Sequence, residues 1–370
     1  MEQSANQRSR IIKILAYIAR IFMGTTFILS GFVKVVDPWG TAIKVNEYLA
    51  IYNLESLKPL SMAFSIWLCG AELMMGLMLM FKVRIRLISI FALISMSFFT
   101  ILSLFSATLF PVEDCGCFGD AIKLTPWQTF AKNIVLLPMA AIIWYRYRPD
   151  KIFAFNRLEL IMATTFFSFA MGLGIYNYLY LPIIDFRPYK IGVNLPSAIG
   201  EAYTSIPEIK TVLVYRNITN GRLKEFDLED VEWQNEAKWE WVETRSETIK
   251  EDASLIGEFA LFDHKDEEVT FNIITHNGRV NMLCITDLCD ISKSCYQSVV
   301  SFIQRVQGAG ESVVIITPQP IDNKAFNIGG VEVECYNIDP STMNTMIRAK
   351  VGLVVLDDGV IVDKRNCRDL

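Results

Sequence analysis

Five apolar stretches of about 20 residues fill the first half of the chain and constrain its fold most strongly. They cover Ile14–Val33, Met62–Phe81, Leu87–Phe110, Trp127–Tyr145 and Leu160–Ile184. An α-helix needs about 20 apolar residues to cross the hydrocarbon of a bilayer. The pattern therefore predicts an all-α membrane bundle of four spans plus a fifth.

Basic residues mark one end of each predicted span and give the bundle an orientation. Three clusters would share one face of a five-span bundle: Arg8, Arg10 and Lys13; Lys82, Arg84 and Arg86; Arg146, Arg148, Lys151 and Arg157. Such clusters mark the cytoplasmic side. We expect a cytoplasmic N-terminus, with residues 34–61, 111–126 and everything after about 185 outside. For a bacterial inner-membrane protein, that space is the periplasm.

The second half of the chain has the composition of a soluble domain. The whole chain carries a net charge of −5. Residues 1–183 hold more basic than acidic residues, and residues 184–370 hold fewer. An acidic soluble half argues against a nucleic-acid partner. The expected divisions are 1–13 (cytoplasmic), 14–146 (four-helix membrane domain), 147–184 (fifth helix), 185–255 (periplasmic, β-rich) and 256–370 (α/β).

The soluble half begins with strands and then alternates strands with a helix. Residues 211–216 and 223–228 flank Asn220-Gly221, which predicts a hairpin, and residues 239–244 add a strand. A second hairpin is expected over 258–271. Beyond it, a strand at 280–286, a helix at 292–308 and strands at 312–317, 346–348, 352–356 and 360–363 predict an α/β layer.

Two thiols one residue apart are the sharpest chemical signal. Asp114-Cys115-Gly116-Cys117-Phe118-Gly119-Asp120 occupies the short loop between the third and fourth spans. A disulfide over so small a ring is strained and easily reduced. Cys115 and Cys117 in an oxidising space therefore suggest redox chemistry, and the alternatives are a structural clip or two free thiols. Metal binding is not expected, because a Cys-x-Cys pair lacks the usual four ligands.

One acidic residue interrupts the second span. Glu72 follows Cys69 by three residues, so both lie on one helix face, and Glu72 falls near mid-bilayer. Intramembrane carboxyl groups are costly and favour a functional role. We expect Glu72 to handle a proton, with Lys34, Lys132 or Asn133 as its polar partner. A hydrogen bond that only stabilises helix packing is the alternative.

The cysteines of the soluble half are less decisive. Cys289 and Cys295 lie at a strand end and a helix start, where a thiol pKa is lowered. They are a candidate second redox pair, although five residues intervene where two are usual. A structural disulfide or a degenerate site is the alternative. Cys335 and Cys367 either form a bridge or stay free.

Several of these residues resemble a known membrane family. Ser30-Gly31-Phe32-Val33-Lys34 leading to Asp37-Pro38, Glu72, the Cys-Gly-Cys motif and Thr125-Pro126 resemble the DoxX-like and MauE-like membrane proteins over about residues 14–146. The resemblance implies thiol–disulfide exchange with periplasmic proteins, or quinone-linked electron transfer with a membrane quinone as the carrier. It assigns Cys115 and Cys117 to the redox motif, and it matches Lys34 and Glu72 to recurrent polar positions.

The end of the chain resembles a thioredoxin-like, TlpA-type domain from about residue 256. The resemblance rests on residues 258–263 and 350–359. The adjacent Cys-x-x-Cys pair is missing, and Val351 stands where the family has its cis-proline. Both departures favour partner docking as the role of this domain.

The sequence thus supports two functions. The first is an inner-membrane thiol-disulfide or quinone-linked electron-transfer protein that acts on a periplasmic thiol protein through Cys115 and Cys117. The second is a non-enzymatic assembly or scaffold subunit, whose degenerate thioredoxin-like domain binds a periplasmic partner or a membrane complex.

Overall fold

Two compact units make up the chain in the computed structural model, which describes residues 2–109, 116–149, 156–204, 209–218, 223–227, 238–248, 256 and 259–370. The first, called here the membrane unit, comprises Met1–Arg187, Ile347–Gly352 and Arg365–Leu370. The second, the C-terminal unit, comprises Pro188–Met346 and Leu353–Lys364. Two short segments from the end of the sequence therefore belong to the membrane unit.

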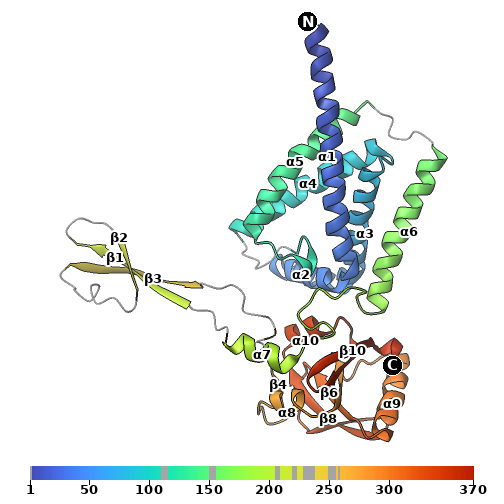
Figure 1. Ribbon diagram of the computed structural model, residues 1–370, viewed down its shortest axis with the longest axis vertical. Coiled ribbons are helices and arrows are strands. Elements are labelled where there is room, and N and C mark those ends of the chain that lie inside the picture. The colour runs from blue at the N-terminus through green and yellow to red at the C-terminus, as the bar shows by residue number, and fades with distance from the viewer. Residues whose placement is uncertain are drawn as a thin grey trace. The chain divides into compact units, whose positions relative to one another are not determined.

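Helices fill the membrane unit, and Figure 1 labels α1 to α6. They are α1 (Glu2–Val36), α2 (Pro38–Ile51), η1 (Glu55–Leu60), α3 (Ser61–Met80), α4 (Ile85–Thr108), η2 (Gly119–Ala121), α5 (Pro126–Tyr147), α6 (Arg157–Leu179) and, from the chain end, η5 (Cys367–Asp369). Each of the five predicted apolar stretches forms a helix over most of its length, although the helix of the fifth ends at Leu179 and not at Ile184. Within the described ranges, four segments are long and apolar enough to cross a membrane: Arg10–Val36, Glu55–Met80, Ile85–Thr108 and Arg157–Leu179.

The predicted span at 127–145 differs from the other four. It forms the 22-residue helix α5, but it does not qualify as a span by its composition. Gln128, Lys132 and Asn133 interrupt its apolar run near the start. Residues of α5 such as Leu136, Ala140 and Ile143 are nevertheless buried in the bundle core. The helix starts with a capping box: Thr125 is the N-cap, Pro126 follows it, and Gln128 completes the box.

Helices α1 and α3 pack at very short range because glycines face each other's backbones. A Cβ atom on Gly31 would lie 2.5 Å from the Leu73 nitrogen. One on Gly76 would lie 2.6 Å from the Ile28 nitrogen. Small residues at helix crossings are the usual means of close approach inside membranes. The approach brings the end of α1 against the middle of α3.

A buried arginine ties the other end of the same helix pair. The Nη1 atom of Arg20, on α1, donates to the carbonyl oxygens of Leu79 and Met80, each at 2.6 Å. The last carbonyls of a helix have no partner within the helix, and a cation is favourable there. Arg20 therefore caps α3 from the neighbouring helix.

The corner between α1 and α2 is a helix cap. The sequence predicts a turn at Asp37-Pro38-Trp39-Gly40 and a short helix after it. In the structure α2 already begins at Pro38, and the Asp37 carboxylate accepts a hydrogen bond from the Gly40 nitrogen at 3.0 Å. Aspartate at the cap followed by proline in the first turn is a strong start signal.

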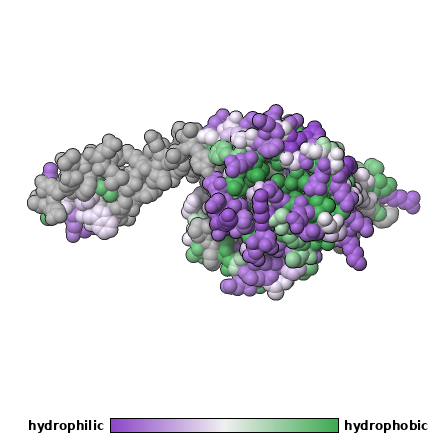
Figure 2. Space-filling view, turned by 90° about the horizontal axis from the view of Figure 1, so that it is seen from below, coloured by the Kyte–Doolittle hydropathy of each residue, from purple (hydrophilic) through white to green (hydrophobic). Residues whose placement is uncertain are grey.

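The C-terminal unit contains an α/β layer, as predicted. Its sheet has the order β10-β9-β5-β6-β8-β4, with β7 paired to β8. The strands are β4 (Leu261–Phe262), β5 (Arg279–Ile285), β6 (Ser312–Thr317), β7 (Ala325–Ile328), β8 (Val331–Ile338), β9 (Val351–Asp357) and β10 (Val360–Asn366). Strands β5, β6 and β8 run parallel, and α9 (Lys293–Gly308) links the first two. Figure 2, seen from below the view of Figure 1, shows hydrophilic residues over much of that face with hydrophobic residues between them.

Several local predictions for this unit need correction. The expected second strand of the 258–271 hairpin is reduced to a bridge between Phe262 and Glu268, because α8 (Thr270–Ile274) begins directly after it. Residues 346–348 are not a strand, since α10 (Pro340–Met346) ends there. Residues 257 and 258 lie outside the described part. Strands β7 and β8 were not predicted.

A separate three-stranded sheet precedes the α/β layer. Its order is β2-β1-β3, with β1 (Ile209–Asn217), β2 (Leu223–Asp227) and β3 (Trp239–Thr248) antiparallel. Leu213, Phe226 and Trp239 form its core. The predicted strands are confirmed, while the Asn220-Gly221 turn lies outside the described residues. The expected β-rich region also holds the helix α7 (Leu195–Thr204).

The glycine contact between α1 and α3 can be tested by adding one carbon atom. Gly31→Ala places its Cβ against the backbone of α3, so we expect a loss of about 1–3 kcal/mol in the free energy of unfolding. Thermal unfolding of the detergent-solubilised protein measures this. Gly172→Ala is the matched control, because its Cβ would meet nothing within 4 Å. Equal midpoints for the two variants would contradict the close approach.

Candidate functional site

A buried ion pair joins α1 to α3 at the point of their close approach. The Lys34 ammonium, in the last turn of α1, contacts the Oε2 atom of Glu72 on α3. The two side chains are only 12% and 13% exposed. Breaking such a pair is costly, because the remaining charge would stay buried without a partner. Of the three partners expected for Glu72, the structure selects Lys34.

The other two expected partners have different roles. The Nδ2 atom of Asn133 donates to the Phe99 carbonyl and to the Ser103 hydroxyl, both at 3.2 Å, and so joins α5 to α4. The Lys132 ammonium lies 5.0 Å from the centre of the Phe118 ring. Neither of these contacts involves Glu72. The prediction that Lys132 or Asn133 pairs with Glu72 is therefore corrected in favour of Lys34. Lys132 instead contacts the ring next to Cys117.

The described part of the Cys-Gly-Cys loop packs against the end of α1. Cys117 is a half-buried free thiol, and its carbonyl accepts a hydrogen bond from the Ser30 hydroxyl at 2.5 Å. Gly119 lies so close that a Cβ atom there would be 3.3 Å from Val33. Cys115 lies outside the described residues. Cys117 itself forms no disulfide in the structure.

Two glycines give this loop its shape. Gly116 has φ 63° and Gly119 has φ 52°. These left-handed angles are strained for residues with a Cβ atom but open to glycine. The loop then closes through a hydrogen bond from the Gly119 nitrogen to the Gly116 carbonyl at 3.2 Å. The left-handed backbone angle of Gly116 thus helps to present Cys117 next to α1.

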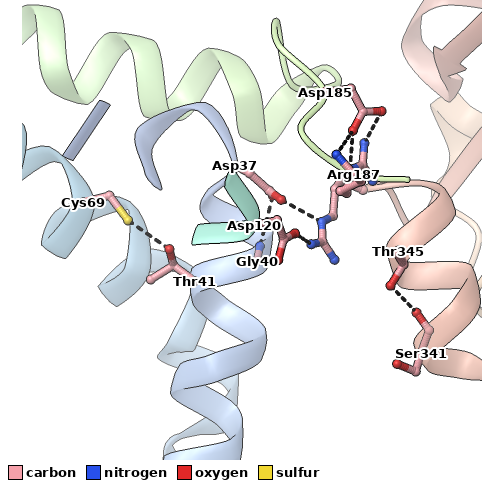
Figure 3. A network of polar contacts seen from close by, with 10 residues as sticks. Asp37, Gly40, Thr41, Cys69, Asp120, Asp185, Arg187, Ser341 and Thr345 are labelled. Carbon is pink, nitrogen blue, oxygen red and sulfur yellow. Dashed lines mark hydrogen bonds and ion pairs between the residues drawn. The ribbon is translucent and has the colours of Figure 1, made fainter. Parts of the chain in front are cut away.

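Lys34 also connects the ion pair to two thiols. A Cβ atom on Gly119, in the Cys117 loop, would lie 4.0 Å from the Cγ atom of Lys34, and Cys69 precedes Glu72 by three residues on α3. Cys69 is fully buried on the same face of α3 as Glu72, and its Sγ atom lies 3.4 Å from the Thr41 hydroxyl of α2, drawn in Figure 3. One cation, one carboxylate and two thiols therefore share this end of the bundle.

A second charged group lies beside the loop and was missed from the sequence. The guanidinium of Arg348 contacts Asp37 at 2.9 Å and Asp120 at 2.5 Å. Asp37 was expected as a supporting polar residue, and the structure places it at the α2 cap. Arg348 lies 311 positions from Asp37 in the chain, so no local pattern signals the contact. Figure 3 shows both aspartates directed to the same point.

The C-terminal cysteines do not form the expected pairs. Cys289 is an exposed free thiol, whereas Cys295 is disulfide-bonded, so these two are not bridged to each other. Cys335 is free and Cys367 is disulfide-bonded, so they are not bridged either. Cys295 does lie in the first turn of α9, where its nitrogen donates to the Ser292 hydroxyl at 3.4 Å. The structure thus does not join Cys289 to Cys295, and their role as a redox pair stays a prediction.

Metal-ligating side chains do not gather in the part of the chain that the structure describes. There, no group of three or more His, Cys, Asp or Glu residues is placed to hold an ion. The chemistry available at the site is that of thiols, one ion pair and one arginine with two carboxylates.

Comparison with known proteins supports the membrane character of the first half. Residues 12–146 match the family described as methylamine utilisation protein MauE. Protein TlpB of Flavobacterium psychrophilum is 29% identical over 140 residues, which is 35% of this chain and 36% of that protein. The chain thus matches about a third of the length of this curated relative. No solved structure matches significantly.

The match and the helices agree on one point. A MauE-like domain at residues 12–146, together with several helices long and apolar enough to cross a bilayer, identifies the chain as a multi-pass membrane protein. A separate α/β domain follows it in the C-terminal unit.

Thiol reactivity should separate the cysteines of the C-terminal unit. Burial raises the pKa of Cys284 to about 12 and that of Cys335 to about 11. At about pH 8 no more than roughly one molecule in a thousand carries either thiolate. We expect alkylation of the folded full-length protein to modify Cys289 first, as measured by peptide mass spectrometry. Labelling of Cys335 should rise with pH up to its pKa, and equal rates at all three positions would refute this assignment.

Proposed function

We propose that the protein is a membrane thiol–disulfide oxidoreductase, with Cys115 and Cys117 as its redox pair. In this proposal the pair exchanges disulfides with a thiol protein outside the cytoplasm and passes electrons to or from a membrane quinone. The MauE-like match at residues 12–146 supports a membrane role of this class.

The observation that carries the proposal is the position of Cys117 beside the Lys34–Glu72 pair. The half-buried Cys117 is hydrogen-bonded through its carbonyl to Ser30, and a Cβ atom on the neighbouring Gly119 would lie 4.0 Å from the Cγ atom of Lys34. The thiolate is the nucleophile in disulfide exchange, and a nearby cation stabilises it. A cysteine that only clipped the loop would need no such cation.

The chemistry balances as two successive exchanges. The thiolate of a reduced client attacks the Cys115–Cys117 disulfide, one sulfur leaves as a thiolate, and the client's second thiol resolves the mixed disulfide. The client is oxidised and the pair is reduced. A quinone then takes two electrons and two protons from the pair, giving the disulfide and a quinol. In this proposal the Lys34–Glu72 pair would hold a proton during thiol ionisation.

The charge pattern supports an orientation for this chemistry. The turn between α3 and α4 contains Lys82 and Arg84, and the end of α5 carries Arg146 and Arg148. Basic residues at span ends favour the cytoplasmic side. With α5 crossing the bilayer as a partly polar helix inside the bundle, Cys117 and the C-terminal unit face the opposite side. We propose the bacterial inner membrane, with these parts in the periplasm. That space maintains disulfides.

For the C-terminal unit we propose a thioredoxin-like docking domain. The order β10-β9-β5-β6, with α9 between the parallel strands β5 and β6, supports a thioredoxin-like core. Cys289 is free while Cys295 is already disulfide-bonded, which leaves no reducible pair between them. In this proposal the acidic domain would bind a client protein.

The same cysteine state favours a second candidate function. A C-terminal unit with no adjacent redox pair fits a non-enzymatic assembly subunit that binds a periplasmic partner. In that case the Lys34–Glu72 pair would fix helix packing only. The two functions differ in whether Cys115 and Cys117 change state.

Thiol trapping in intact cells decides between them. We expect Cys115 and Cys117 to shift between alkylated and protected forms when a reductant is added, and a Cys115→Ser/Cys117→Ser variant to abolish client oxidation. Cys335→Ser, which removes a buried free thiol, is the control. Full function in the double variant would leave the assembly function.

The ion pair can be tested separately from the thiols. Glu72→Gln leaves the Lys34 ammonium buried and unpaired, which costs about 3–5 kcal/mol, and should slow thiol turnover. Lys34→Met/Glu72→Gln removes both charges, so its unfolding midpoint should recover while turnover stays slow. Turnover is followed by the rate of Cys117 reoxidation in membranes. If turnover recovers together with stability, the pair acts in packing alone.

A further inference from the structure

Arg348, a buried residue near the end of the sequence, forms an ion pair with Asp120, three residues after Cys117. The Arg348 side chain is 5% exposed, and it contacts Asp37 and Asp120 through different nitrogen atoms, Nε and Nη2. All three residues belong to the membrane unit. The planar fork of arginine can hold two carboxylates in fixed directions, which a lysine cannot do.

The two carboxylates belong to different pieces of the site. Asp37 caps α2 through the Gly40 nitrogen and lies three residues after Lys34. Asp120 lies in η2, three residues after Cys117. Arg348 therefore joins the segment that follows the ion pair to the segment that carries the thiol. Both aspartates and the Gly40 nitrogen appear in Figure 3.

Electrostatics make this contact strong. Burial alone would lower the pKa of Arg348, yet the neighbouring Asp37 and Asp120 carboxylates outweigh it and hold that pKa above its ordinary value. The guanidinium thus remains charged. Without it, two carboxylates would face each other in a half-buried site, and the loop would move away from the α2 cap to separate them.

The loop has few other fixed points among its described residues. They include the Ser30 hydroxyl on the Cys117 carbonyl, the Gly119–Gly116 hydrogen bond and the Lys132 contact with Phe118. Two glycines with left-handed backbone angles lower the cost of rearranging the loop. A charged contact at its end therefore decides how closely Cys117 is held against α1.

We propose that Arg348 is a positioning residue for Cys117: by binding Asp37 and Asp120 together, it keeps the thiol half-buried beside Lys34. The inference rests on the proposed function for its biological meaning, but the positioning itself is measurable without a client. Arg348 touches no reacting atom in this scheme.

The experiment measures the alkylation rate of Cys117 against pH in the full-length protein in detergent, by mass spectrometry of the peptide that contains it. Arg348→Gln should raise that rate about tenfold or more, because the released loop exposes the thiol. It should also move the pH at which the rate is half-maximal. Arg348→Lys keeps one charge and should lie between Arg348→Gln and the unchanged protein.

A neutral triple variant separates positioning from stability. Arg348→Gln/Asp37→Asn/Asp120→Asn removes the repulsion, and asparagine still caps α2. We expect its unfolding midpoint to return toward that of the unchanged protein while Cys117 stays fast to alkylate. Recovery of the slow rate would overturn the proposal and leave a merely structural ion pair. Should Arg348→Gln fail to fold, the lysine and triple variants still decide.

Arg368→Gln is the matched control, since Arg368 is an exposed arginine of the same unit. It should leave the Cys117 rate unchanged, and an equal increase in both variants would overturn the proposal. The redox function can fail on its own, if the Cys115→Ser/Cys117→Ser variant remains active. The positioning inference fails separately, for example if Cys117 alkylates equally in the presence and absence of the Arg348 guanidinium.

Discussion

The buried pair of Lys34 and Glu72 is the interaction on which the site depends. An ammonium and a carboxylate can be placed inside a helical bundle only when each is held in contact with the other. Gly31 and Gly76 allow that contact, because they bring the backbones of α1 and α3 to a distance that any side chain would prevent. The helix crossing and the charged site are therefore one structural feature.

Around this pair, polar contacts join α1, α2, α3 and the Cys117 loop. The Ser30 hydroxyl donates to the Cys117 carbonyl, and the Cys69 thiol donates to the Thr41 hydroxyl of α2. The start of α2 gives the Asp37 carboxylate to Arg348. Inside an apolar bundle these contacts stabilise the fold, because a buried polar group without a partner is costly. The arrangement holds a thiol next to a cation at one end of the bundle.

Much of this was accessible from the sequence. The apolar stretches, the Thr125-Pro126 cap and the strand–helix–strand pattern at residues 280–317 are local signals, and the structure confirms each of them. Lys34 was named as a partner of Glu72, and the structure selects it over Lys132 and Asn133. Those two failed because sequence spacing gives the depth of a residue in the bilayer but not the direction in which its helix faces.

Local patterns determined which segments become helices or strands, and which residues carry charge or a thiol in an apolar setting, because both follow from neighbouring residues. Only the tertiary structure decided which of these residues meet. Arg348 reaches Asp37 across 311 positions, and Cys289 remains free while Cys295 is disulfide-bonded. The physical reason is that such contacts depend on helix rotation and chain path, which many distant packing interactions set together.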